Sequence, residues 1–215
     1  MRRIIFSTIA AATISAGAIV TLQAQNAPQL PGQMDASRVT AGTYTADANH
    51  SLIGWRVNHF GFNDYFGIFG DVAGTLTIDP ANPAAAKVDV TVPIANVVTA
   101  SEGLTGHLLR PGADGKAADF FGAQPAPARF VSTAVEPVGT TGATITGDLT
   151  LNGVTRPVTL TAEFTGAGAN PMNQKETVGF EGSTTIRRSE FDVNGALPVV
   201  SDEVELNITI AFEKQ

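Results

Sequence analysis

The stretch HSLIGWRVNH, residues 50–59, places every second side chain on one face of an extended chain: Ile53, Trp55, Val57 and His59. A period of two residues is that of a β-strand that buries one face and shows the other to solvent. Residues 203–213 repeat the pattern, with one face made of Val204, Leu206, Ile208, Ile210 and Phe212. The chain therefore begins and ends its folded part with amphipathic strands.

The same alternation recurs between these two segments. It predicts strands over residues 43–46, 51–59, 66–79, 87–97, 129–137, 144–151, 154–165, 175–188 and 203–213. The Asn152-Gly153 pair favours a tight hairpin turn, because both residues tolerate positive φ. About eight antiparallel strands in about 170 residues fit an all-β fold, a single closed up-and-down barrel. A barrel of this size can hold an apolar ligand.

One segment departs from the strand pattern. Residues 100–110 place Leu104, His107 and Leu108 at helical spacing, and Ser101 is suited to cap a helix. A short helical segment is therefore expected here. Ala118-Asp-Phe-Phe-Gly122 follows in an irregular crossing, where Phe120 and Phe121 could cover the mouth of a barrel.

The N-terminus has the organisation of an export signal. Two arginines precede a long uncharged stretch rich in small residues, which ends at Ala24. We expect a signal peptide over residues 1–24, although the stretch is long enough that an uncleaved anchor remains the alternative. Residues 25–42 are rich in Pro, Gln and Gly and are expected to form a flexible leader. Residues 43–215 are expected to form one domain.

Composition narrows the class of protein. The chain has no cysteine, so it forms no disulfide and lacks the lipidated cysteine of bacterial lipoproteins. Its formal net charge of −7 disfavours nucleic acid and anionic lipid headgroups as partners. No later segment is apolar enough to span a membrane, so stable membrane insertion is not expected after signal cleavage. These features indicate a soluble periplasmic or secreted protein.

Eight sequence elements, in order from Tyr44 to Phe212, together resemble the YceI-like proteins. The matching elements are Asp47-Ala-Asn-His50-Ser51, Trp55 to Gly61, Phe66-Gly67-Ile68-Phe69 with Gly74, His107-Leu108 with Ala118 to Phe121, Phe130 to Thr133, Gly147 to Val158, Ile186 with Arg188 and Phe191, and Ser201 to Val204. The resemblance implies a periplasmic polyisoprenoid-binding protein with a lipocalin-like barrel that performs no chemistry on its ligand. Two segments depart from the family pattern, the insertion at residues 111–117 and the run GAQPAPAR at 122–129.

Residues that could bind a ligand are mostly aromatic. Core packing and a lipid tunnel need the same residue types. The sequence therefore does not show which aromatic residues line a tunnel and which fill the core. The small residues Gly54, Gly74, Ala143, Gly147 and Gly182, expected to face inward, favour open space. The candidate ligand-binding residues are Trp55, His59, Phe66, Phe69, Phe120, Phe121, Phe130, Arg188 and Phe191.

Two of the candidate residues, His59 and Arg188, are polar, and for each the sequence allows either a ligand-binding or a structural role. His59 either contacts a ligand headgroup or is a structural polar group of the interior. Arg188 has the strand parity of Ile186 and is expected to point inward, where an unpaired charge would be costly. It either anchors a phosphate or quinone oxygen or forms an ion pair with an aspartate. The candidate partners are Asp47, Asp119 and Asp192.

Enzymatic motifs are missing: the chain has no Gly-x-Ser-x-Gly, no cysteine nucleophile and no phosphate loop. The histidines His50, His59 and His107 could in principle form a zinc site. However, a straight strand would hold His50 and His59 roughly 30 Å apart. We therefore expect no catalytic residue, no metal and no cofactor.

The leading functional hypothesis is a periplasmic carrier that sequesters a polyisoprenoid, an isoprenoid quinone or a similar long-chain amphiphile in an apolar tunnel. One alternative is a small metal-dependent enzyme that uses the histidines. The other is a stress-related interaction module whose barrel is filled by side chains. A homodimer is a further possibility that the sequence leaves open.

Overall fold

The computed structural model describes residues 29–215. The predicted signal peptide, and the leader as far as residue 28, lie outside the described residues. Residues 31–215 form one compact unit, which contains every helix and strand discussed below.

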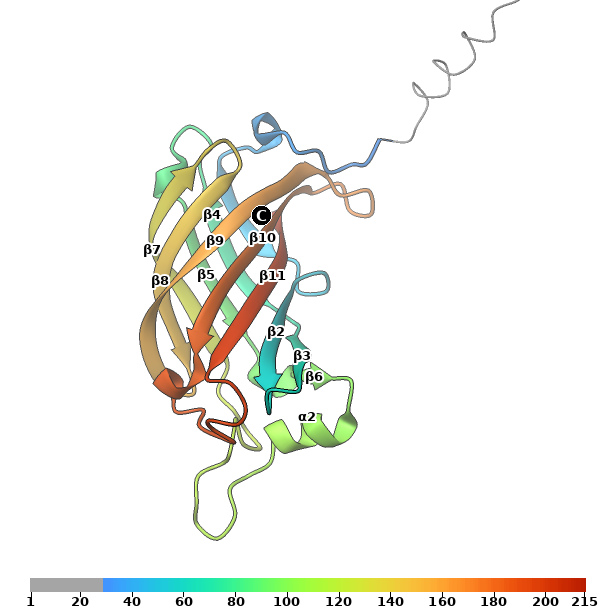
Figure 1. The fold of residues 1–215 in the computed structure, drawn as a ribbon. Coiled ribbons are helices and arrows are strands. Elements are labelled where there is room, and N and C mark those ends of the chain that lie inside the picture. The colour runs from blue at the N-terminus through green and yellow to red at the C-terminus, as the bar shows by residue number, and fades with distance from the viewer. Residues whose placement is uncertain (1–28) are drawn as a thin grey trace, which may run out of the picture. The chain divides into compact units, whose positions relative to one another are not determined.

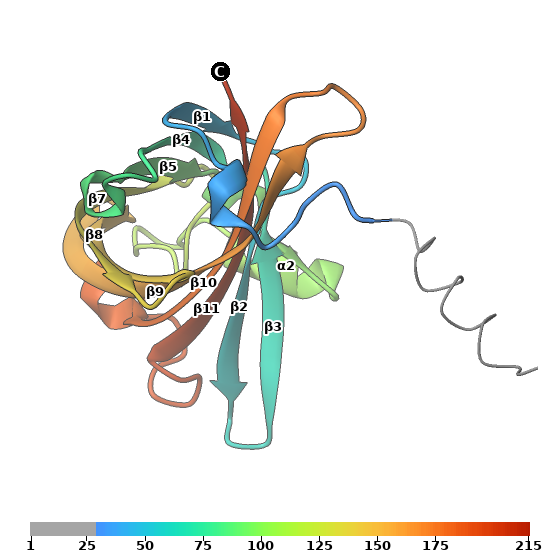
Figure 2. The ribbon, with the colours of Figure 1, turned by 90° about the horizontal axis from the view of Figure 1, so that it is seen from above.

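Eight antiparallel strands close into a barrel, as predicted (Figures 1 and 2). The ring closes because β11 pairs with both β10 and β1. In ring order the strands are β1 (Gly42–Ala46), β4 (Ala73–Ile78), β5 (Lys87–Val92), β7 (Ala128–Val138), β8 (Gly142–Leu151), β9 (Val154–Ala169), β10 (Glu176–Arg187) and β11 (Glu203–Lys214).

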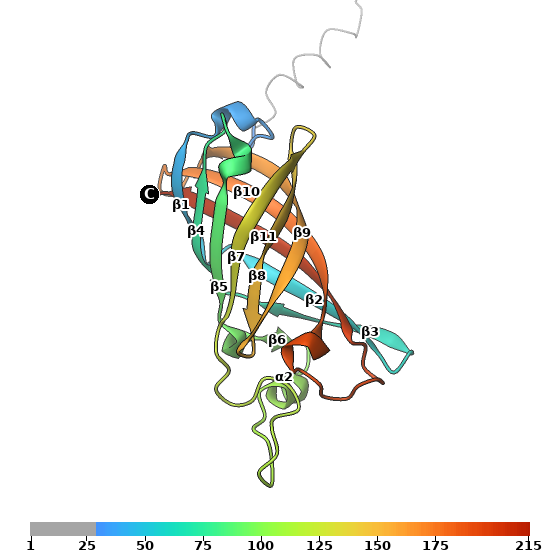
Figure 3. The same ribbon diagram turned by 90° about the vertical axis from the view of Figure 1, so that its left-hand side faces the viewer.

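Three further strands branch from the barrel at β11. The second half of β11 pairs with β1, whereas its first half pairs with β2 (Leu52–His59). β2 continues the sheet to β3 (Asn63–Phe69) and to the two-residue β6 (Val98–Thr99). The β2–β3 hairpin therefore projects beyond the barrel wall (Figures 2 and 3).

Two predicted strands were too long. The segment 66–79 is split into β3 and β4 by a bend at Gly70–Val72, where Asp71 has φ of 55°. The segment 87–97 leaves the sheet after Val92, because Pro93 has no N–H to donate to a neighbouring strand. A 3₁₀-helix, η3 (Ile94–Asn96), follows.

The predicted helix is confirmed as α2 (Glu102–Leu108), with the Ser101 hydroxyl accepting a hydrogen bond from the Leu104 N–H at 3.3 Å. It lies across the lower end of the barrel in Figure 1. The predicted turn between β8 and β9 is also confirmed, since Asn152 and Gly153 have φ of 51° and 78°. No helix within residues 29–215 combines the length and hydrophobicity that crossing a membrane requires.

The second half of the predicted leader has structure of its own. Gln33 forms an isolated bridge with Ala167 of β9, with N–H to O distances of 3.0 and 2.8 Å in the two directions. Asp35 caps the 3₁₀-helix η1 (Ala36–Arg38), and Val39 is buried. Within the described residues, the packed part of the chain thus begins before Gly42.

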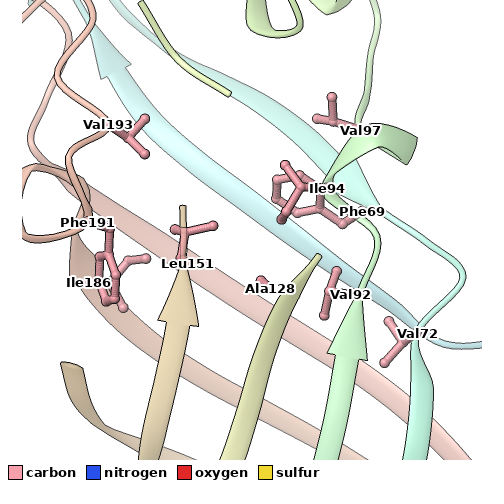
Figure 4. Close-up of a cluster of buried hydrophobic side chains, with 10 residues drawn as sticks. All are labelled: Phe69, Val72, Val92, Ile94, Val97, Ala128, Leu151, Ile186, Phe191 and Val193. Carbon is pink, nitrogen blue, oxygen red and sulfur yellow. The ribbon is translucent and has the colours of Figure 1, made fainter. Parts of the chain in front are cut away.

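The hydrophobic core is divided between the two ends of the barrel. The lower cluster includes Phe69, Val92 and Ile94 on one side and Leu151, Ile186 and Phe191 on the other (Figure 4). The upper cluster consists of Val39, Tyr44, Ala46, Leu76, Phe164, Ala167, Val178 and Phe212. This division leaves the middle of the barrel to side chains that are only partly buried. The elements outside the sheet include two more 3₁₀-helices, η2 (Pro83–Ala85) and η4 (Arg188–Phe191).

Candidate ligand-binding site

The upper half of the barrel contains a cavity of about 350 Å³. Its wall is mainly apolar and comes chiefly from the barrel strands, with further residues from β2, from the segment before β1 and from the β4–β5 and β7–β8 connections. Alternation explains this lining, because Leu206, Ile208, Ile210 and Phe212 of β11 all face the same side. Small residues at Ala143, Ala162 and Gly182 keep this part of the barrel open.

The lower half encloses a second cavity, also of about 350 Å³. It lies between the β2–β3 hairpin, helix α2 and the segments that join the barrel strands at this end. The lining is again mainly apolar, with the polar exceptions His59, Tyr65, Thr99, His107 and Arg188.

The two cavities meet inside the barrel. Five residues from five strands or strand ends line both of them: Ile53, Val92, Ala128, Leu149 and Leu206. The cavities therefore lie end to end and share a wall of apolar side chains. This arrangement gives no support to the alternative of a barrel filled by its own side chains.

Aromatic rings gather near both ends of this pair of cavities, which we call the double cavity. In the upper half, Phe180 stands edge-on between Phe164 and Phe212, at centroid distances of 5.8 and 6.5 Å. In the lower half, Phe121 packs against Phe69 at 6.1 Å, and Phe120 packs against His107 of α2 at 5.4 Å. The expectation that Phe120 and Phe121 cover one end of the barrel agrees with these contacts.

Arg188 corrects the prediction in two ways. It lies in η4 and not in a strand, and its guanidinium donates to three backbone carbonyls: those of Ser201 at 2.9 Å, Val193 at 2.8 Å and Val200 at 2.9 Å. None of the three predicted aspartates is its partner in these bonds. Burial lowers the pKa of Arg188, and the nearby charge of Asp202 opposes that shift. The Arg188 side chain thus holds the segment between η4 and β11 by hydrogen bonds, and it also lines the lower cavity.

Seven of the nine candidate residues line the double cavity. Phe130 lines the upper cavity, and the lower one is lined by Trp55, His59, Phe69, Phe120, Phe121 and Arg188. Phe66 and Phe191 line neither. Phe66 pairs with Arg56 on the outer face of β2 and β3 and is 61% exposed, whereas Phe191 is 1% exposed within the lower core cluster.

The sequence prediction missed several lining residues. They include Tyr65, Leu104 and Val204 in the lower cavity and Phe164, Phe180 and Phe212 in the upper one. Strand parity would have found most of them, because Val204 and Phe212 share the face of Leu206 in β11 and Tyr65 shares the face of Phe69 in β3. Within the β2–β3 hairpin, the Trp55 ring packs directly on Gly67. A Cβ added to Gly67 would come within 2.2 Å of Cζ2 of Trp55.

The three histidines do not come together as a metal site. His50 is exposed and its Nδ1 lies 2.7 Å from Asp47, while His107 contacts Arg110 at 3.0 Å and Asp119 at 3.5 Å. His59 packs against Phe60 at 4.3 Å. Over residues 29–215, no group of three or more His, Cys, Asp or Glu side chains is arranged to hold a metal ion.

Comparison with known proteins agrees with this geometry. Residues 44–212 match the family model described as the YceI-like domain. A UPF0312 protein of Ectopseudomonas mendocina is 38% identical over 178 residues, which cover 81% of this chain and 89% of that protein. The crystal structure of BcnA from Burkholderia cenocepacia has a TM-score of 0.64 and 26% identity, covering 77% of this chain and 98% of that one.

A more distant likeness concerns the fold alone. A polyisoprenoid binding domain from Saccharophagus degradans, implicated in plant cell wall breakdown, has a TM-score of 0.55. The two chains are 14% identical, with 80% of this chain and 98% of that one covered.

Proposed function

The chain belongs to the YceI-like domain family, and from that premise we propose that it binds a long-chain isoprenoid lipid inside its barrel and carries it. The observation that carries the proposal is the pair of apolar cavities that share one wall. A single elongated tail could pass from one cavity to the other. The polyisoprenoid-binding domain with the same fold supports this class of ligand.

The size and chemistry of the double cavity suit such a ligand. Each cavity of about 350 Å³ lies at the lower end of the range of small-molecule sites, so the two together accept a larger molecule. Each buried CH₂ group contributes about 0.8 kcal/mol, so a tail of several isoprene units can bind firmly through apolar contact alone. The polar side chains that line the lower cavity favour that end for the headgroup.

The proposed carrier acts outside the cytoplasm, in the periplasm, after removal of the N-terminal signal. It performs no chemistry on the lipid and requires no cofactor. Its ligand is a polyisoprenoid, an isoprenoid quinone or a similar amphiphile with one long apolar chain.

A direct test uses the only tryptophan of the chain, Trp55, which lines the lower cavity. We expect an added isoprenoid quinone to quench its fluorescence saturably, and a lipid extract of natively purified protein to contain a long-chain isoprenoid by mass spectrometry. If quenching is unsaturable and the extract contains no such lipid, the proposal is wrong.

A variant at the shared wall tests whether one tail uses both cavities. Ala128→Leu adds bulk where the cavities meet, so quinones with long tails should bind about tenfold more weakly, since the loss of a few buried CH₂ groups suffices. A quinone with one isoprene unit should bind unchanged, because one cavity holds it. Ala134→Leu, at an exposed position of the same strand, is the control. Equal losses for long and short tails would contradict a shared tunnel.

A further inference from the structure

The β2–β3 hairpin ends in exposed apolar side chains that the barrel does not need for its core. Phe62 is 89% exposed and Phe60 is 49% exposed. Val199 joins them, since the Phe60 N–H donates to its carbonyl at 2.8 Å and its side chain is 48% exposed. We call these three residues the hairpin tip. Exposed apolar side chains that lie together, as at this projecting turn, mark interaction surfaces, whereas isolated ones do not.

The turn at the hairpin tip has a backbone conformation that the Phe60 side chain disfavours. Phe60 and Gly61 have φ of 55° and 72°, and the Phe62 N–H donates to the His59 carbonyl at 3.1 Å. Positive φ at both central residues is the geometry that Asn-Gly adopts between β8 and β9 of this same chain. A bulky aromatic residue is disfavoured in this region, so Phe60 occupies a strained backbone conformation at the turn.

The hairpin tip is continuous with the lower cavity. Phe60 is half exposed and at the same time lines that cavity, together with His59 and Val200 beside it. The β2–β3 hairpin extends away from the barrel wall, clear of the other strands (Figures 2 and 3). An apolar surface therefore runs from solvent, across Phe60, into the cavity proposed to hold the lipid.

Charge indicates which partner fits this surface. Residues 57–63, VNHFGFN, contain no Lys, Arg, Asp or Glu, whereas the chain as a whole has a formal net charge of −7. An uncharged apolar tip on an acidic protein suits a neutral bilayer and is disfavoured on an anionic one. The charged residues that flank this segment, Arg56 and Asp64, form an ion pair with each other at 2.8 Å.

We propose that the hairpin tip is a membrane-docking element, which inserts Phe60 and Phe62 into the surface of a neutral phospholipid bilayer. The inserted tip holds the mouth of the lower cavity against the bilayer, so an isoprenoid tail moves between the two without crossing water. This inference rests on the proposed carrier function, because it assigns the membrane as the place where the carrier loads and unloads.

Docking is tested first by site-specific labelling, which the absence of cysteine makes simple. An environment-sensitive fluorophore on Phe62→Cys should shift to shorter wavelength when phosphatidylcholine vesicles are added, with little dependence on salt concentration. Met172→Cys is the matched control, because Met172 is 90% exposed in the β9–β10 loop at the upper end (Figure 1). That label should not respond.

Transfer is tested with Phe62→Ser, which changes no residue that lines either cavity. Uptake of an isoprenoid quinone from phosphatidylcholine vesicles should slow by about tenfold, the factor expected for loss of one inserted aromatic side chain. Uptake of the same quinone from a detergent dispersion should stay as in the wild type. Met172→Ser should leave both rates unchanged.

The outcomes separate this inference from the proposed function. Wild-type protein that takes up no quinone from detergent or vesicles refutes the carrier function itself. Wild-type uptake with no label shift at position 62, or with unchanged vesicle uptake in Phe62→Ser, overturns the docking inference alone. A label shift that depends on protein concentration and not on vesicles also overturns it, since a second copy would then cover the tip.

Discussion

At the scale of single residues, buried polar groups define the lower end of the barrel. Arg188 is 5% exposed and satisfies three backbone carbonyls from the segment between η4 and β11. Its guanidinium also lies over the Phe120 ring, at 5.8 Å from the centroid. One side chain therefore connects two irregular segments that surround the lower cavity.

We expect Arg188→Met to destabilise the protein by on the order of 3 kcal/mol or more, because three buried carbonyls lose charge-assisted donors. Arg188→Lys should recover only part of that loss, since an ammonium group lacks the planar fork of donors. Urea denaturation measures both values. Arg187→Met, at the exposed neighbouring position, is the control. Unchanged stability in Arg188→Met would assign the residue to the ligand alone.

At the scale of elements, the contact between β2 and β3 depends on a missing side chain. Trp55 pairs with Gly67 across the two strands, and its indole ring occupies the space of a Cβ at Gly67. The Trp55 indole N–H is buried and has no hydrogen-bond partner in the described structure. Close packing on the glycine, and not a hydrogen bond, therefore holds the ring at the wall of the lower cavity.

Gly67→Ala should destabilise the protein by about 1–3 kcal/mol, the usual cost of overpacking a well-packed contact. The added methyl group would displace the indole ring, so the emission maximum of Trp55 should also change. Gly70→Ala, just beyond the end of β3, is a suitable control because no atom lies within 4 Å of its added Cβ. Thermal unfolding followed by tryptophan fluorescence gives both readouts, and equal behaviour of the two variants would refute this account of the contact.

At the scale of the whole barrel, a carboxylate of β10 connects that strand to β1 and to the segment before it at the upper end. Glu176 of β10 accepts hydrogen bonds from the N–H and hydroxyl of Thr40, both at 2.7 Å, and lies 2.6 Å from the Tyr44 hydroxyl. Burial acts to raise the pKa of Glu176, but the hydrogen bonds from Thr40 and Tyr44 and the charge of Lys214 outweigh it and lower the pKa.

A lowered pKa in the folded state stabilises the protein above the ordinary pKa of an unfolded glutamate, and the effect disappears as pH falls through the folded value. Glu176→Gln should therefore be less stable than the wild type at neutral pH, by on the order of 1–3 kcal/mol. The difference should shrink in acid. Thermal unfolding from neutral to acid pH measures it, with Glu136→Gln at an exposed site as control. A difference that is constant with pH would exclude this role.

Strand alternation predicted the all-β class of fold and part of the cavity wall. Trp55, Phe69 and Phe130 line cavities because they share a face with their apolar neighbours, which the order of residues alone reveals. Phe66 was assigned wrongly because it has the parity of Leu76 in the single strand predicted over residues 66–79. The break between β3 and β4 removes that relation, and Phe66 lies opposite Arg56 on the outer side. The family resemblance contributed the class of ligand, which no pattern of residues contained.

Local sequence determined most of the strands, the capped helix and the Asn152-Gly153 turn, because these depend on neighbours a few residues away. Only the tertiary structure decided that β11 pairs with β1 along one half and β2 along the other, that Arg188 meets backbone carbonyls and not aspartates, and that two cavities share a wall. These features join residues distant in sequence, and their geometry follows from how the barrel closes, which local periodicity does not encode.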